Sequence, residues 1–113
     1  MRVLLICAGL FVLAGCSTSP QQYNWGPYEG MLFTHFHEPA GQTEQLQLYL
    51  DHVRAGEAGE RPLGPGMFAE AGTFLLEQGD LAGAREFYEL EARHWPESRP
   101  FMETLLVNLP EEN

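Results

Sequence analysis

Apolar side chains recur at helical spacing over three stretches in the middle of the chain. Residues 44–55 carry them at i, i+3, i+4 and i+7, as Leu46, Tyr49, Leu50 and Val53. Residues 67–78 and 81–95 show the same periodicity, led by Phe68, Ala71 and Leu75 and by Leu81, Ala84, Tyr88, Ala92 and Trp95. This spacing puts the apolar residues of each stretch on one face. The pattern therefore predicts three amphipathic helices that pack together.

Polar and small residues mark the ends of these predicted helices. Thr43 is placed to cap the first helix, and Gly56 is placed to end it. Asp80 is placed to cap the third helix, and Pro96 stops it.

The remaining parts of the C-terminal half give a fourth helix and a loop. Residues 100–109 are expected to be helical, with an apolar side formed by Phe101, Leu105 and Leu109. Residues 56–65 are rich in glycine, proline and charge. We expect them to form a loop that stays outside the core.

Aromatic residues dominate the segment ahead of the first predicted helix. Tyr23, Trp25 and Tyr28 surround the turn residues Gly26 and Pro27, and further apolar residues follow: Met31, Leu32, Phe33 and Phe36. A turn followed by a short helix or an extended piece is expected here. Tyr23, Trp25 and Tyr28 are interpreted either as a cap on the domain or as contact residues for a partner.

The second and third predicted helices, at about residues 65–96, resemble one tetratricopeptide repeat of about 34 residues. Gly72 and Ala84 lie where that repeat has small residues, which let two antiparallel helices approach closely. Glu91 departs from the pattern, because its position usually holds a small or apolar residue. The resemblance implies an all-α fold, a small tetratricopeptide-like domain preceded by the aromatic segment. It favours protein binding over catalysis, since such repeats bind protein segments in a groove.

The N-terminus has the order of a lipoprotein export signal. Arg2 precedes a short uncharged apolar run, residues 3–13, which is shorter than the roughly 20 residues that span a bilayer. Leu13, Ala14, Gly15 and Cys16 follow and resemble the bacterial lipobox. The resemblance implies a signal peptide at 1–15, fatty acylation of Cys16 by chains such as palmitate, and a lipidated tether at 16–22. Ser17 in place of an aspartate implies the periplasmic face of the outer membrane.

The mature chain is expected to comprise residues 16–113, with its helical domain at 23–113. The composition of the mature chain excludes some classes of function. These 98 residues contain five arginines, no lysine and sixteen acidic residues, a net charge of −11 with neutral histidines. This charge argues against nucleic-acid binding and against electrostatic attraction to anionic lipids, because both need clustered cations. Cys7 leaves with the signal peptide and Cys16 carries lipid, so no internal disulfide is expected.

Candidate catalytic chemistry is sparse. No nucleophile with a nearby base and no phosphate-binding loop is recognisable, so we expect neither an enzyme nor a cofactor. The histidines His35, His37, His52 and His94 are the only candidates for metal binding, and no metal site is assigned. His35 and His37 would share a face only in an extended segment. A periplasmic metal- or small-ligand-binding lipoprotein is the alternative function.

The lipobox, the aromatic block and the helical pair together resemble an uncharacterised family of small bacterial lipoproteins. The block reads Tyr23-x-Trp25-Gly26-x-Tyr28, followed by Glu29 and Leu32. Members of that family are encoded beside lipoproteins similar to the curli-secretion channel. The resemblance implies an accessory protein-interaction role in an envelope assembly, with a membrane anchor and an envelope protein partner.

Overall fold

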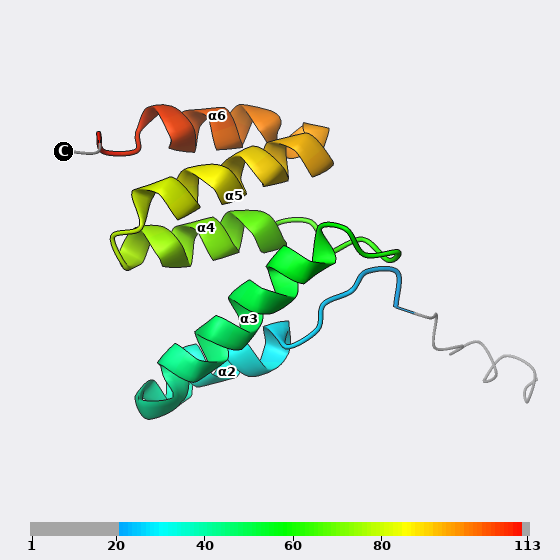
Figure 1. Cartoon of the computed structure of the whole chain (residues 1–113), viewed down its shortest axis with the longest axis vertical. Helices are drawn as coiled ribbons and strands as arrows, with labels where there is room; N and C mark the ends of the chain where they lie inside the picture. The colour runs from blue at the N-terminus through cyan, green and yellow to red at the C-terminus, as the bar shows by residue number, and fades with distance from the viewer. Residues whose placement is uncertain (1–20, 112–113) are drawn as a thin grey trace, which may run out of the picture.

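The computed structural model describes residues 21–111, and this part of the chain is all-helical (Figure 1). It contains five α-helices: α2 (Tyr28–His37), α3 (Gln42–Gly56), α4 (Met67–Glu77), α5 (Leu81–His94) and α6 (Arg99–Val107). Two short 3-10 helices, η2 (Pro39–Gly41) and η3 (Pro96–Ser98), join α2 to α3 and α5 to α6. The prediction of an all-α fold behind an aromatic segment is confirmed. None of the described helices is long and apolar enough to cross a membrane.

The helices form two groups (Figure 1), and residues of α2 and α3 contact α4 from its start, at Met67, to its end, at Glu77. Helices α4, α5 and α6 lie side by side as a layer, each antiparallel to the next. Helices α2 and α3 form a second antiparallel pair, and α3 crosses toward α4 at a steep angle. Each helix thus packs mainly on its neighbour in the chain.

The predicted inner faces of the first three amphipathic helices are confirmed. Their buried members are Tyr49, Leu50, Val53, Phe68, Ala71, Leu75, Ala84 and Tyr88. The close approach at Gly72 is confirmed as well. A Cβ atom added there would lie 2.9 Å from the Tyr88 ring and 3.1 Å from the Ala84 carbonyl oxygen. The missing side chain is therefore what allows α4 and α5 to pack at this distance.

The predicted cap at Asp80 is confirmed, and the one at Thr43 is wrong. The Asp80 carboxylate accepts a hydrogen bond of 2.9 Å from the Gly83 N–H. Thr43 lies inside α3, because η2 runs directly into a helix that begins at Gln42. The Gln42 side chain instead donates to the His35 carbonyl at 2.6 Å, which satisfies an acceptor near the end of α2.

Two other expectations are corrected. Phe101 is 63% exposed, and the inner face of α6 begins one residue later at Met102 and continues through Leu105 and Leu106. Leu109, which follows the end of the helix, is buried. In the loop of residues 56–65, Leu63 is buried in the core. A Cβ atom on Gly56 would overlap the Leu63 side chain, so the glycine at the end of α3 makes room for it.

A candidate interaction surface at the N-terminal aromatic segment

The structure brings the three sequence-predicted aromatic residues together in one series of ring contacts. The Tyr23 ring lies edge-on to Trp95 at 5.6 Å and to Trp25 at 6.0 Å between centroids. Trp25 contacts Tyr28 at 5.6 Å, and Tyr28 contacts the buried Tyr49 at 5.9 Å. Tyr23, Trp25 and Tyr28 are each half-buried. The series ties the N-terminal segment to α2, to α3 and to the residue that follows α5.

Backbone contacts hold the same segment in place. The Asn24 N–H donates to the Pro62 carbonyl at 2.8 Å, and the Asn24 carbonyl lies 3.2 Å from Nε2 of His52. The Trp25 ring covers Gly64, where any Cβ atom would overlap it. Gly26 has a φ of +50° and faces the His52 ring. The segment therefore caps the helical domain, while its contact with a partner stays a prediction.

The outer side of this cap is open and carries both apolar and polar side chains. A hollow of about 350 Å³ is lined by Gln21, Trp25, Gly26, Tyr28, Glu29 and Leu32. Beyond it on α2, Phe33 is 55% exposed and Phe36 is 70% exposed. Large exposed aromatic side chains grouped on one helix are typical of interaction surfaces.

A second depression lies where α2, α3 and α4 meet, and we call it the junction groove. Its floor is apolar, formed by Met31, Leu46 and Phe74, and its rim is polar, formed by His35, Gln42, Thr43, Glu77 and Gln78. Its volume of about 190 Å³ is smaller than the roughly 300–1,000 Å³ typical of sites for small molecules. The groove therefore suits a single inserted side chain better than a free ligand.

Burial raises the pKa of three side chains that lie between the N-terminal hollow and the junction groove. Partial burial raises the pKa of the Glu70 carboxyl, and the Tyr28 hydroxyl and His35 oppose this rise. Burial raises the pKa of Tyr28. The negative charge of Glu70 and the hydrogen bond between Tyr28 and Glu70 raise this pKa further. Burial also raises the pKa of Tyr49, whose hydroxyl donates to the Met67 carbonyl at 3.0 Å. Glu70 and Tyr28 therefore form a linked pair between α4 and α2.

Glu91 has a structural role that the sequence pattern only flagged as a departure. Its side chain is 1% exposed, and Oε1 accepts hydrogen bonds from the Gly66 N–H at 2.8 Å and from the Ser98 hydroxyl at 3.3 Å. Among the described residues, Oε2 has no hydrogen-bond partner. Gly66 is the N-cap of α4, with a φ of +89°. Because a helix N-terminus attracts negative charge, the carboxylate takes the place of a capping side chain for α4.

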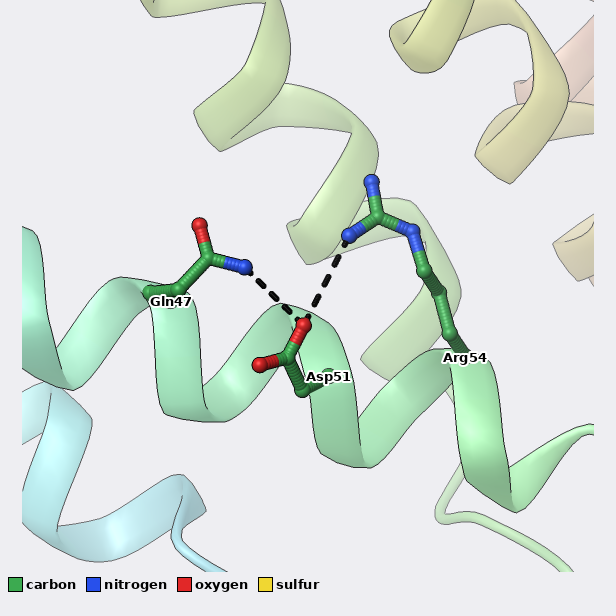
Figure 2. Close-up of polar contacts among 3 residues, drawn as sticks. All are labelled: Gln47, Asp51 and Arg54. Atoms are coloured by element: carbon green, nitrogen blue, oxygen red, sulfur yellow. Dashed lines mark hydrogen bonds and ion pairs between the residues drawn. The ribbon is translucent and has the colours of Figure 1, made fainter.

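A row of polar contacts follows the outer side of α3 (Figure 2). The Gln47 side-chain amide donates to Asp51 at 2.9 Å, and Asp51 lies 3.9 Å from the Arg54 guanidinium. The Arg54 guanidinium also lies 5.6 Å from the centre of the Phe87 ring on α5. Since the Asp51 and Arg54 side chains are more than half exposed, this row contributes little stability. The Arg54 side chain thus reaches from α3 to α5.

The four histidines lie in separate environments. His35 lies edge-on to Phe74 at 5.1 Å, and the His37 ring stacks on Phe33 at 4.6 Å. His52 contacts Asn24, as described above, and His94 stacks on Phe68 at 5.0 Å. Because α2 is helical, His35 and His37 do not share a face. Within residues 21–111, no three His, Cys, Asp or Glu side chains are grouped so that they could hold a metal ion.

The N-terminal predictions lie outside the described residues. These are the signal peptide at 1–15, acylation of Cys16 and most of the tether at 16–22.

Comparison with known proteins places the domain in a family without assigning an activity. No curated protein and no solved structure matched the chain. One family model, described as a domain of unknown function (DUF4810), matches residues 22–105, which cover the aromatic segment and all the helices up to most of α6. The chain therefore belongs to the DUF4810 family.

Proposed function

We propose that this chain is a lipid-anchored envelope protein whose helical domain binds a second envelope protein. Acylated Cys16 holds the domain at the periplasmic face of the outer membrane in this proposal. The lipobox supports the anchor, and the described domain begins only five residues after Cys16. The family match, which starts at residue 22, supports the same division between tether and domain. The protein acts as an accessory interaction module in an envelope assembly, and its proposed partner is a curli-channel-like lipoprotein.

The junction groove is the observation that carries the binding proposal. It combines an apolar floor with a polar rim, and its volume fits one side chain. Glu77 on the rim belongs to a chain with far more acidic than basic residues. We therefore expect the partner to insert an apolar side chain that is flanked by a basic residue facing Glu77.

Photo-crosslinking in intact cells tests this proposal. A photoreactive amino acid replaces Thr43 or Gln78 on the exposed rim, and the matched control replaces Thr104, which is exposed on α6. The proposal predicts crosslinks to the curli-channel-like lipoprotein from the two rim positions and none from residue 104. It also predicts that Cys16→Ser abolishes them, because the domain is then no longer anchored in the outer membrane. Equal crosslinking from all three positions, or none from the rim, would contradict the proposal.

A further inference from the structure

Helix α2 is apolar on two sides but packs on only one. Met31 and Thr34 face inward and are buried. Phe33 and Phe36, three residues apart, are exposed on the outer side of the helix, and the half-buried Leu32 lies four residues before Phe36. We call these three residues the outward stripe. Glu29, one turn before Phe33, is the only acidic residue in α2, which contains no lysine or arginine. A surface helix normally presents polar side chains to water, so this outward stripe calls for an apolar neighbour.

The stripe adjoins the first described residue of the chain through Leu32. Gln21, the first described residue, lines the same hollow as Trp25 and Leu32. Gln21 is the fifth residue after Cys16, and a fully extended chain covers at most about 18 Å over five residues. Acyl chains on Cys16 would thus keep this hollow and the adjoining stripe within a short distance of the bilayer surface.

The charge of this part of the domain also differs from that of the rest. Residues 21–37 contain one acidic residue among seventeen, whereas residues 38–113 contain fifteen among seventy-six. Anionic phospholipids repel the acidic remainder most strongly, so the N-terminal segment is the part that can approach them at least cost. Trp25 and Tyr28 beside the hollow are residue types enriched at membrane interfaces.

We infer that the outward stripe of α2, together with the hollow beside Trp25, rests on the phospholipid surface. Phe33 and Phe36 enter the boundary between headgroups and acyl chains, as the apolar face of an interfacial helix does. The contact is apolar rather than electrostatic, which agrees with the scarcity of basic residues. It would orient the domain so that tether and α2 both face the bilayer. The inference rests on the proposed lipid anchor.

Depth-dependent quenching tests this contact on the acylated protein. The mature chain carries no cysteine besides Cys16, so Phe36→Cys offers a single thiol for an environment-sensitive fluorophore. Phe101→Cys on α6 is the matched control, because Phe101 is 63% and Phe36 is 70% exposed. Phe33→Cys serves as a second test position. Each labelled protein is reconstituted into vesicles of phosphatidylethanolamine and phosphatidylglycerol, with or without brominated acyl chains.

If the stripe rests on lipid, the emission of the fluorophores at 33 and 36 shifts to shorter wavelength on vesicles, and brominated lipid quenches it. The emission of the fluorophore at 101 neither shifts nor is quenched. If the protein floats with the vesicles but labels 33 and 36 behave like label 101, the anchor stands and the lipid contact is wrong. A blue shift without quenching would place the stripe against a second copy and would also overturn the inference. Failure of the unlabelled acylated protein to float would instead refute the anchor and the proposed function.

Discussion

Glu91 is a single residue on α5 that joins three parts of the fold. Its carboxylate accepts from Gly66 at the start of α4 and from Ser98 in η3. Glu91→Ala leaves the Gly66 N–H without its acceptor, and we expect a loss of about 1–3 kcal/mol in the free energy of unfolding. Glu91→Gln keeps the acceptor oxygen and should cost clearly less. Chemical denaturation of both variants measures this difference, and equal losses would contradict the capping role.

Two helical glycines should respond in opposite directions to the same added methyl group. At Gly72 the new Cβ meets the Tyr88 ring and the Ala84 carbonyl, so Gly72→Ala should destabilise the protein by about 1–3 kcal/mol. At Gly30 the nearest atom, Oε1 of Gln45, is 3.9 Å away. Gly30→Ala should therefore stabilise the protein by about 0.5–1 kcal/mol through helix propensity. Thermal melts compare the two, and a stabilised Gly72→Ala protein would refute the tight crossing of α4 and α5.

Glu70 should make the protein less stable at neutral pH than in mild acid. Its pKa in the folded state is raised above the ordinary value of 4.5 by burial. The folded protein thus holds the proton more tightly than the unfolded chain does. The corresponding stability is fully present below pH 4.5 and is lost as the pH rises through the raised pKa.

Glu70→Gln should consequently stabilise the protein at pH 7, and this gain should shrink toward pH 4.5. Denaturation at a series of pH values measures it. Glu86→Gln, at an exposed position on α5, reports the general effect of removing one charge from an acidic chain. A gain at Glu70 that matches the gain at Glu86 at every pH would show that burial of Glu70 is unimportant.

The aromatic segment contacts both the loop of residues 56–65 and helix α3, and it holds the two together. Trp25→Ala removes its contacts with Tyr23, Tyr28 and Gly64, and we expect a cost of roughly 2 kcal/mol, below the range for a fully buried tryptophan. The hydrogen bond from the Asn24 amide to Pro62 should open with it. Hydrogen exchange at the Asn24 amide should therefore accelerate far more than exchange in α5. If hydrogen exchange accelerated equally across the whole domain, a local role of the aromatic segment would be contradicted.

The elements predicted from sequence were those with strong periodicity. Tyr49, Phe68 and Tyr88 recur with other apolar residues at helical spacing, so three helices and their inner faces followed from the pattern. Helix α6 has apolar residues on several sides, so the pattern predicted Phe101 as an inner residue, whereas Met102 is the one that is buried. Leu63 was missed because a lone apolar residue among glycines and prolines has no period.

Contacts between distant parts of the molecule could not be predicted from the sequence, although several of the residues that make them could be identified. The grouping of Tyr23, Trp25 and Tyr28 in one short segment was visible, whereas their contacts with Trp95 and Tyr49 depend on how distant helices pack. The junction groove draws on three helices and could not be read from any single stretch. The only sign in the sequence that Glu91 is buried was its position, which usually holds a small or apolar residue in the tetratricopeptide repeat.

The two proposed contacts, with a partner and with lipid, use separate surfaces of the molecule. The stripe on α2 faces outward near the tether, and the junction groove lies between α2, α3 and α4. A domain held at the bilayer by α2 would still present the groove to a partner. Both proposals depend on attachment of the chain to the membrane.

The intact mass of the protein extracted from membranes tests that attachment most directly. Acylation predicts the mass of residues 16–113 increased by a diacylglycerol on the Cys16 sulfur and an acyl chain on its amino group. A mass equal to the uncut chain, or to residues 16–113 without lipid, would refute the lipid anchor.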